Sequence, residues 1–167
     1  LIYLVNAYSV LARDGVKHKQ SLILKISAKN KVLEDYKDSP ESVIDPQYAR
    51  LVNDILSDHE ARLPIFGTSL NIPALPDHQI AIKTGTSNDF RDAWSIGYTP
   101  SLVVGVWAGN NNNQPMTKEG ASFRAAVPIW KNFMIEALRI KPPEVFNKPD
   151  PLFVEKSPNE DDFSGVE

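Results

Sequence analysis

The apolar positions along the chain predict three helices. In three segments, apolar side chains recur every three or four residues, which is the spacing of one helix face. We expect the first helix over residues 1–12, the second from Pro46 with Asp45 as its N-cap, and the third over about residues 125–138. Their apolar stripes are Leu4, Val5, Tyr8 and Leu11; Tyr48, Leu51, Val52, Ile55 and Leu56; and Ile129, Phe133 and Leu138. In the third helix we expect these side chains to point inward.

Other segments have the composition and length of strands. The expected strands are residues 21–26, 31–33, 79–86, 93–98 and 102–108. The first two flank a turn at residues 28–30, and the last two are joined so tightly by residues 99–101 that an antiparallel hairpin is expected. Residues 102–107 are apolar on both faces, which is typical of a strand covered by helices. Residues 63–77 contain three prolines and a glycine, so we expect a connecting loop there.

The composition is that of one globular domain followed by an acidic tail. The 167 residues are 42% hydrophobic and 23% charged, values that do not favour disorder throughout. The net charge of −3 is uneven, because residues 147–167 hold two lysines against six acidic residues and so leave the rest at +1. Neither part suggests a nucleic-acid partner. We expect a domain over residues 1–141 and a tail or linker with several prolines over residues 142–167.

The sequence contains neither cysteine nor a segment that could span a membrane, and both facts limit the functions to be considered. There is no cysteine, which excludes disulfides, thiolate metal sites and a cysteine nucleophile. No apolar run approaches the ~20 residues that a membrane helix needs, and neither a starting methionine nor a signal peptide is visible. We therefore expect a fragment of a longer protein.

The candidate chemistry lies at the end of the third predicted strand. A short apolar run leads into Lys83, Thr84, Gly85 and Thr86, so a strand end carries a cation, two hydroxyls and a gap in the row of side chains. Lys83 and Gly85 share one face of the strand, and Thr84 and Thr86 share the other. Each residue also has a structural interpretation: a lysine that extends to solvent, a glycine at a bulge, and threonines as ordinary strand residues.

Several neighbouring residues are open to both interpretations. Ser87, Asn88 and Arg91 could cap the turn between strands or contact a substrate. For Trp94, Trp107 and Tyr98 we favour a role as core aromatics over a role as binding platforms.

Other catalytic arrangements do not fit the sequence. No serine has a lysine three residues later, so a Ser-x-x-Lys nucleophile motif is absent. Ser69-Leu70-Asn71 matches Ser-x-Asn by letters but lies only twelve residues before Lys83, in a proline-rich segment, and we reject it. Ile82 stands where a phosphate-binding loop needs glycine. The three histidines lack metal-ligand spacing, so we expect neither a metal nor an organic cofactor.

The region around Lys83 resembles the transpeptidase domain of bifunctional class A penicillin-binding proteins, and the resemblance covers roughly residues 1–135. Lys83-Thr84-Gly85 matches the third motif of these enzymes and of serine β-lactamases. The other matching segments are Arg91-Asp92-Ala93-Trp94, Gly97-Tyr98-Thr99-Pro100, Val103-Val104-Gly105-Val106-Trp107-Ala108-Gly109-Asn110 and Gln114-Pro115-Met116. The resemblance implies an α+β fold, an antiparallel sheet flanked by helices, of which only the C-terminal portion is present.

The resemblance also implies roles for individual residues. The ammonium group of Lys83 would support proton transfer and attract the terminal carboxylate of the substrate, and the hydroxyls of Thr84 and Thr86 would lie where that carboxylate binds. Gly85 would let the substrate backbone approach the strand, and the N–H of Thr86 would be one oxyanion-hole donor. We add Ser87 and Asn88 as candidate substrate-binding residues, with the turn-capping alternative still open. The nucleophilic serine would lie upstream of Leu1.

The implied function is D,D-transpeptidation, the cross-linking of peptidoglycan stem peptides by acyl transfer through a serine that β-lactams also acylate. The partners would be stem peptides, β-lactams and the missing N-terminal part of the same protein, on the outer face of the bacterial cytoplasmic membrane. Two alternatives stay open. One is a D,D-carboxypeptidase or β-lactamase-like hydrolase, and the other is a non-catalytic module that binds peptidoglycan or a partner.

Overall fold

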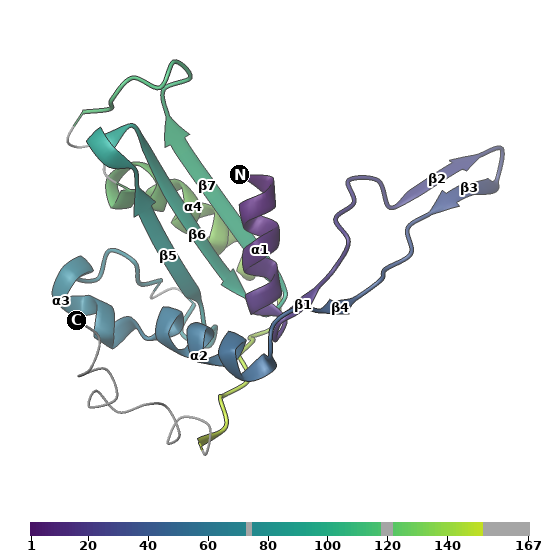
Figure 1. Cartoon of the computed structure of the whole chain (residues 1–167), viewed down its shortest axis with the longest axis horizontal. Helices are drawn as coiled ribbons and strands as arrows, with labels where there is room; N and C mark the ends of the chain where they lie inside the picture. Colours follow the sequence, from purple (N-terminus) through teal and green to yellow (C-terminus); the bar gives the residue numbers. More distant parts are fainter. Residues whose placement is uncertain (73–74, 118–121, 152–167) are drawn as a thin grey trace, which may run out of the picture.

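A three-stranded antiparallel sheet forms the centre of the computed structural model, which describes residues 1–72, 75–117 and 122–151 (Figure 1). The strands are β5 (Ala81–Thr86), β6 (Asp92–Thr99) and β7 (Leu102–Gly109), in the order β5-β6-β7. This confirms the three predicted strands and the hairpin between the last two. Among the described residues, no strand pairs with the outer edge of β5 or of β7.

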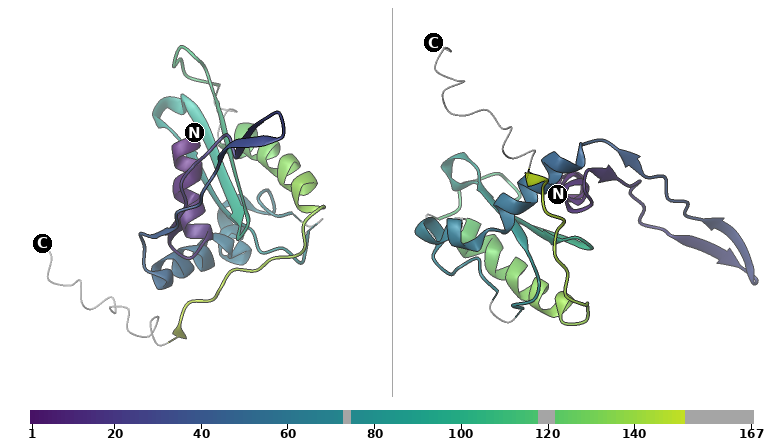
Figure 2. Two further views of the ribbon diagram at one scale, coloured as in Figure 1. Left: turned by 90° about the vertical axis from the view of Figure 1, so that its right-hand side faces the viewer. Right: turned by 90° about the horizontal axis from the view of Figure 1, so that it is seen from below.

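Two helices cover opposite faces of this sheet. α1 (Ile2–Ala12) packs on one face and α4 (Ser122–Leu138) on the other (Figures 1 and 2). Gly97 of β6 lies directly beneath the ring of Trp130 from α4, and Gly105 of β7 lies beneath Val5 from α1. A side chain at either glycine would push the helix away from the sheet. The predicted α+β class is confirmed.

The larger apolar cluster lies between the sheet and α4. Its buried members are Leu70, Leu75, Ile82, Val127, Trp130, Met134 and Leu138. The predicted inward face of the last helix was right for Leu138 and wrong for Ile129 and Phe133, which are exposed by 57% and 56%. Trp130 takes the inward position because its ring fills the space above Gly97, a long-range fit that helical spacing does not reveal.

The second helix begins where the sequence predicts. α2 (Pro46–Ser57) has Asp45 as N-cap, whose carboxylate accepts a hydrogen bond from the backbone N–H of Gln47 at 2.8 Å. Its predicted stripe is only partly right, because Tyr48 and Ile55 are exposed. The buried residues of this helix are Ala49 and Asn53.

Asn53 explains which side of α2 faces inward. Its amide Nδ2 donates to the Leu11 carbonyl oxygen at 2.8 Å, and its Oδ1 accepts from the hydroxyl of Tyr98 at 2.8 Å. One polar side chain thus joins α1, α2 and β6. Burial beside Tyr8 raises the pKa of Tyr98, so the hydroxyl stays a neutral donor.

A third short helix occupies part of the predicted loop. α3 (His59–Phe66) starts at Asp58, whose carboxylate accepts from the N–H of Ala61 at 3.1 Å. Pro64 lies inside this helix and removes one backbone donor. The loop prediction was therefore wrong up to Phe66.

A long hairpin projects from the domain between α1 and α2 (Figure 1). Its base is β1 (Val16–Lys17) paired with β4 (Glu41–Ser42), and its outer part is β2 (Lys25–Ala28) paired with β3 (Lys31–Asp35). Lys29 and Asn30 both have positive φ, as a two-residue hairpin turn requires. The predicted strand pair is confirmed, with the first strand starting later than expected.

The described part of the predicted tail runs along the domain. Phe146 is buried against Tyr98, and Glu144 accepts hydrogen bonds from the Thr99 hydroxyl at 2.8 Å and from the Ser101 N–H at 3.2 Å. Lys148 pairs with Asp54 at 2.7 Å. The rest of the predicted tail, residues 152–167, lies outside the described residues, and the division of the chain at residue 141 stays a prediction.

Candidate functional site

The predicted site residues lie together at one end of β5 and in the turn that follows it. In the register with β6, Lys83 stands opposite Ile96 and Gly85 opposite Trp94, so both belong to the sheet face that α1 covers. Thr84 and Thr86 belong to the α4 face, with Thr84 half-buried and Thr86 exposed. All four lie on β5, whose outer edge pairs with no other strand of the described residues.

Lys83 is an exposed cation at this open edge. Its Nζ donates to the carbonyl oxygen of the adjacent Thr84 at 2.6 Å, and no carboxylate of the described residues forms an ion pair with it. An ammonium group on a four-carbon stem can redirect its three donors to an incoming anion. The strand end therefore offers positive charge to a ligand.

No contact or backbone conformation in the described part of the chain requires glycine at position 85. Gly85 does not have a positive φ, and a Cβ at this position would meet only the Cβ of Trp94 at 3.7 Å, an ordinary van der Waals distance. Gly97 and Gly105 differ, because side chains there would overlap a helix. What glycine provides at position 85 is therefore an unobstructed surface along the strand.

Ser87 and Asp92 close the turn after β5. The backbone N–H of Asp92 donates to Ser87 Oγ at 3.0 Å, and the backbone N–H of Ser87 donates to the Asp92 carbonyl oxygen at 3.1 Å. These two hydrogen bonds support the interpretation of Ser87 as a cap of the turn. Asn88 begins the 3-10 turn η1 (Asn88–Phe90), in which Asp89 and Phe90 both have positive φ.

Arg91 connects this turn to the loop after β7. Its Nη1 donates to the carbonyl oxygen of Asn113 at 2.6 Å, and the backbone N–H of Met116 donates to the Phe90 carbonyl oxygen at 2.9 Å. These bonds fasten the loop after β7 to the turn after β5. The separate sequence segments 91–94 and 114–116 therefore serve one local structure.

The carboxylate of Asp92 is the part of the site that sequence reasoning missed. Its Oδ2 accepts from the indole Nε1 of Trp107 at 3.2 Å. Hydrogen bonds from Ser87, Trp107 and Trp94 lower the pKa of Asp92 below the usual aspartate value. An aspartate between an arginine and an alanine gives no local signal of this role, which depends on the register that places Trp94 opposite Trp107.

The two tryptophans are not core residues, which corrects the prediction. Trp107 is 37% exposed and Trp94 is half-buried. Trp94 lies on the same sheet face as Lys83 and Gly85, and Trp107 stands opposite it, so the pair forms apolar surface beside the open strand end. The prediction was right for Tyr98, which is fully buried.

The rejected Ser-x-Asn segment lies elsewhere in the fold. Leu70 is buried in the α4 cluster, and Asn71 lines a cavity near the start of β5, away from Thr86. Within the described ranges, no helix is both long and apolar enough to cross a membrane.

Most of the chain matches one known protein family. Residues 1–134 match the family model of the penicillin binding protein transpeptidase domain. The chain belongs to this transpeptidase family. The sequence-based recognition of the family is thereby confirmed.

Relatives in two bacteria extend the match beyond the family model. The chain is 35% identical over 149 residues to penicillin-binding protein 1A of Aquifex aeolicus, covering 89% of this chain and 20% of the relative. It is 32% identical over 154 residues to penicillin-binding protein 1A of Neisseria lactamica, covering 88% and 19%. The chain thus spans about a fifth of the length of these relatives.

Solved structures of penicillin-binding proteins share the fold. The chain superposes on PonA1 from Mycobacterium tuberculosis with a TM-score of 0.75 and 31% identity, covering 88% of this chain and 40% of that one. It superposes on penicillin-binding protein 1A from Haemophilus influenzae with a TM-score of 0.77 and 24% identity, covering 87% and 27%. The transpeptidase fold therefore extends over most of the chain.

Proposed function

We propose that this chain supplies the Lys-Thr-Gly strand of a serine D,D-transpeptidase that cross-links peptidoglycan stem peptides. The observation that carries the proposal is the outer edge of β5, which no strand of the described residues covers and which carries an exposed lysine and an unobstructed glycine. A stem peptide would add to this edge as an antiparallel strand, held by backbone hydrogen bonds.

Each residue of the strand end has a role in this proposal. Lys83 supplies positive charge for the terminal carboxylate of the stem peptide and assists proton transfer. The hydroxyls of Thr84 and Thr86 bind the same carboxylate, and Ser87 and Asn88 contact the substrate at the turn. The N–H of Thr86 donates to the developing oxyanion, a type of contact worth about 2.7–4 kcal/mol in the transition state.

The remaining catalytic groups come from outside this chain. A serine of the same protein attacks the carbonyl carbon of the D-Ala-D-Ala amide. A C–O ester bond forms, the C–N bond breaks, and the serine hydroxyl proton is passed to the nitrogen of the departing D-Ala. A neighbouring stem-peptide amine then attacks the ester, forms a new C–N amide bond, breaks the C–O bond and passes a proton back to the serine oxygen. β-lactams acylate that serine, and the protein acts on the outer face of the cytoplasmic membrane, where peptidoglycan is found. The chemistry uses no metal and no organic cofactor.

Labelling with fluorescent penicillin tests this proposal. The full-length protein should carry label that survives boiling in detergent, whereas the isolated 167-residue chain should not, because it has no Ser-x-x-Lys serine. A product assay with a stem peptide and an amine acceptor then separates acyl transfer from hydrolysis. Covalent labelling of the isolated chain, or no labelling of the full-length protein, would contradict the proposal.

A further inference from the structure

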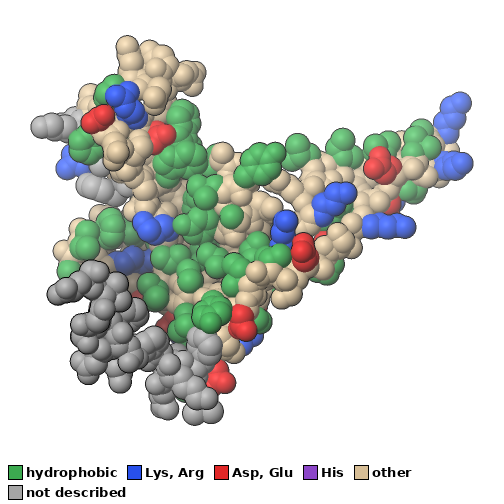
Figure 3. Space-filling view, in the orientation of Figure 1, with side chains coloured by type: hydrophobic (Ala, Val, Ile, Leu, Met, Phe, Trp, Pro, Cys, Tyr) green, Lys and Arg blue, Asp and Glu red, His purple; other side chains and the backbone are tan. Residues whose placement is uncertain are grey.

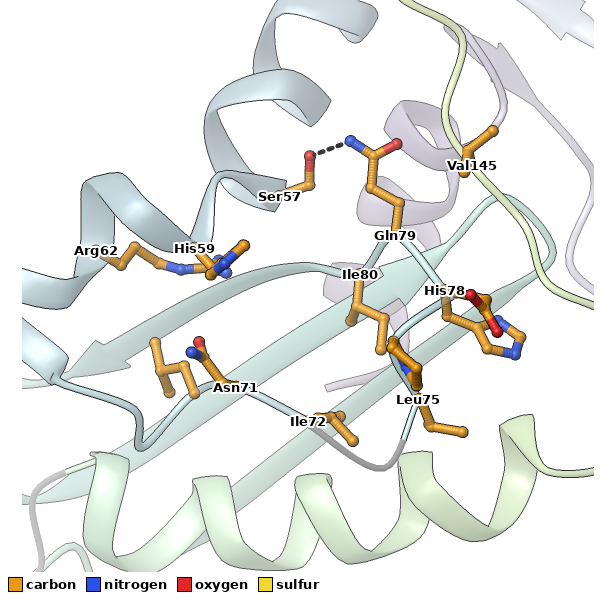
Figure 4. A pocket seen from close by; sticks show the side chains of 13 residues that line it. Ser57, His59, Arg62, Asn71, Ile72, Leu75, His78, Gln79, Ile80 and Val145 are labelled. Carbon is orange, nitrogen blue, oxygen red and sulfur yellow. Dashed lines mark hydrogen bonds between the residues drawn. The ribbon is translucent and has the colours of Figure 1, made fainter.

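A cavity of about 590 Å³ lies between α2, α3 and the segment that leads into β5 (Figure 4). Arg62 and His59 line one wall, and Leu75 and His78 line the opposite one. The volume is within the range of small-molecule sites, about 300–1,000 Å³. The cavity is at the beginning of β5, whereas the proposed stem-peptide contacts are at its end.

Arg62 offers a positive charge to this cavity, and no ion pair of the described residues balances that charge. Its Nη1 donates to the Leu56 carbonyl oxygen at 2.6 Å, and its Nε is buried without a hydrogen-bond partner. No carboxylate of the described residues forms an ion pair with it, although Asp58 lies near enough to attract it. Burial lowers the pKa of Arg62, since the charged form loses hydration.

The rest of the lining is divided between apolar and polar side chains, and the polar ones come from Ser57, His59, Asn71, Asp77, His78 and Gln79. The apolar side chains come from Leu70, Ile72, Leu75, Ile80 and Val145. Asn71 adds an amide, and Asp77 is a carboxylate of the lining that does not pair with Arg62. A half-buried guanidinium beside an apolar wall is destabilised until an anion reaches it. The arrangement suits a ligand with an apolar body and one carboxylate.

We propose that this cavity is a binding site for a carboxylate ligand with an apolar body, held by Arg62. The planar guanidinium would form two parallel hydrogen bonds to the carboxylate, and the apolar walls would cover the remainder of the ligand. Such a carboxylate can belong to a free small molecule or to an acidic segment of protein. Residues 152–167 of this chain contain five acidic residues, so they are one possible source.

Hexanoate and hexan-1-ol are matched probes, since they share the chain length and differ in the charged group. With the full-length protein in calorimetric titrations, hexanoate should bind at least about tenfold more tightly than hexan-1-ol, because hydrogen bonds to charged groups are the stronger class. Arg62→Gln should remove this difference, and Arg62→Lys should keep part of it. Arg139→Gln is the control, since Arg139 pairs with Glu136 on the exposed surface of α4.

The melting temperature of each variant without ligand shows whether it is folded, and Arg62→Lys tests the site if Arg62→Gln does not fold. Deleting residues 152–167 separates the two sources. If this segment supplies the carboxylate, it competes with hexanoate, and its removal should raise the hexanoate affinity. If the natural ligand is a free molecule, the affinity should not change. Equal binding of hexanoate and hexan-1-ol, or wild-type hexanoate affinity in both Arg62 variants, would overturn the proposal.

Discussion

At the scale of single residues, Asp92 links the turn after β5 to the tryptophan pair. Its Oδ2 accepts a hydrogen bond from the indole of Trp107, and the polar groups of Ser87, Trp107 and Trp94 favour the ionised form and lower the pKa of Asp92. Asp92→Asn should therefore destabilise the protein at neutral pH by about 1 kcal/mol, the typical net value of a hydrogen bond near solvent. Thermal melts of both proteins measure the difference.

The pH dependence of that difference has a defined sign. Because the folded state lowers the pKa of Asp92, its contribution is complete above the usual aspartate value of about 3.9 and is lost as the pH falls through the lowered folded value. The difference in the free energy of unfolding between wild type and Asp92→Asn should become smaller as the pH approaches about 3, which is on the order of one pH unit below the usual aspartate pKa. Asp89→Asn, at a well exposed position, is the control. A gap that widens in acid would contradict this account.

Gly85 tests whether the open strand edge has a function. A methyl group at this position would meet only the Cβ of Trp94 at 3.7 Å, so Gly85→Ala should change the free energy of unfolding by no more than about 0.5 kcal/mol. In the full-length protein it should nevertheless slow acylation by a β-lactam, since the methyl would stand where the ligand backbone approaches. Unchanged acylation would show that the glycine is incidental.

At the scale of elements, Gly97 determines how α4 packs. A Cβ at this position would overlap the indole ring of Trp130. Gly97→Ala should therefore cost about 1–3 kcal/mol of stability, the usual range for overpacking a core. Gly85→Ala, on the neighbouring strand of the same sheet, is the matched control. Denaturant unfolding of both variants gives the comparison, and equal stability would contradict the packing described for α4.

The packing of α4 also explains which elements were predictable. Local signals were sufficient for the three strands, the Asp45 cap and the turn at Lys29-Asn30, because each depends on neighbouring residues. The inward face of α4 was not predictable from spacing, since the helix has two apolar stripes and Gly97, far away in sequence, selects the one with Trp130.

The candidate site shows the same limit. Lys83 and Gly85 could be identified from their motif and from strand alternation, which places them on one face. The role of Asp92 could not, because it depends on cross-strand pairing of Trp94 with Trp107 and on the fold of the turn between β5 and β6. Arg62 belongs to no motif, and its proposed role rests on a buried Nε and on the lack of an ion pair within the described residues.

At the scale of the whole molecule, exposed apolar side chains gather in several places, and Figure 3 shows those over α1 and the projecting hairpin. Exposed apolar residues of α1 are Leu1, Ile2, Tyr3 and Leu4; those of the projecting hairpin are Leu22, Ile23, Leu24, Ile26, Val32 and Leu33; those of α4 are Ile129 and Phe133. Contiguous apolar surface beyond a few hundred Å² is unusual for a monomer. We expect the rest of the full-length protein to cover part of it.

The isolated 167-residue chain should therefore self-associate. Sedimentation velocity at increasing concentration should show growing aggregates, whereas the full-length protein in detergent should keep one defined size. Replacing Tyr3 and Leu22, which are exposed by 84% and 87%, with serine should reduce the association of the isolated chain without lowering its melting temperature. A monomer with a sharp, reversible thermal transition would contradict this expectation.

The central claim is that the ammonium group of Lys83 serves the acylation chemistry of the full-length protein. The most direct measurement is the second-order rate of acylation by a β-lactam, with a melting curve for each variant. Lys83→Ala should slow acylation by about 10²–10⁴, the range for acid–base assistance, and change stability by no more than about 0.5 kcal/mol, since Lys83 is exposed. Lys83→Arg should restore little, because a planar guanidinium does not replace a compact ammonium group. Near-normal acylation in Lys83→Ala would contradict the account and make the strand end a structural feature alone.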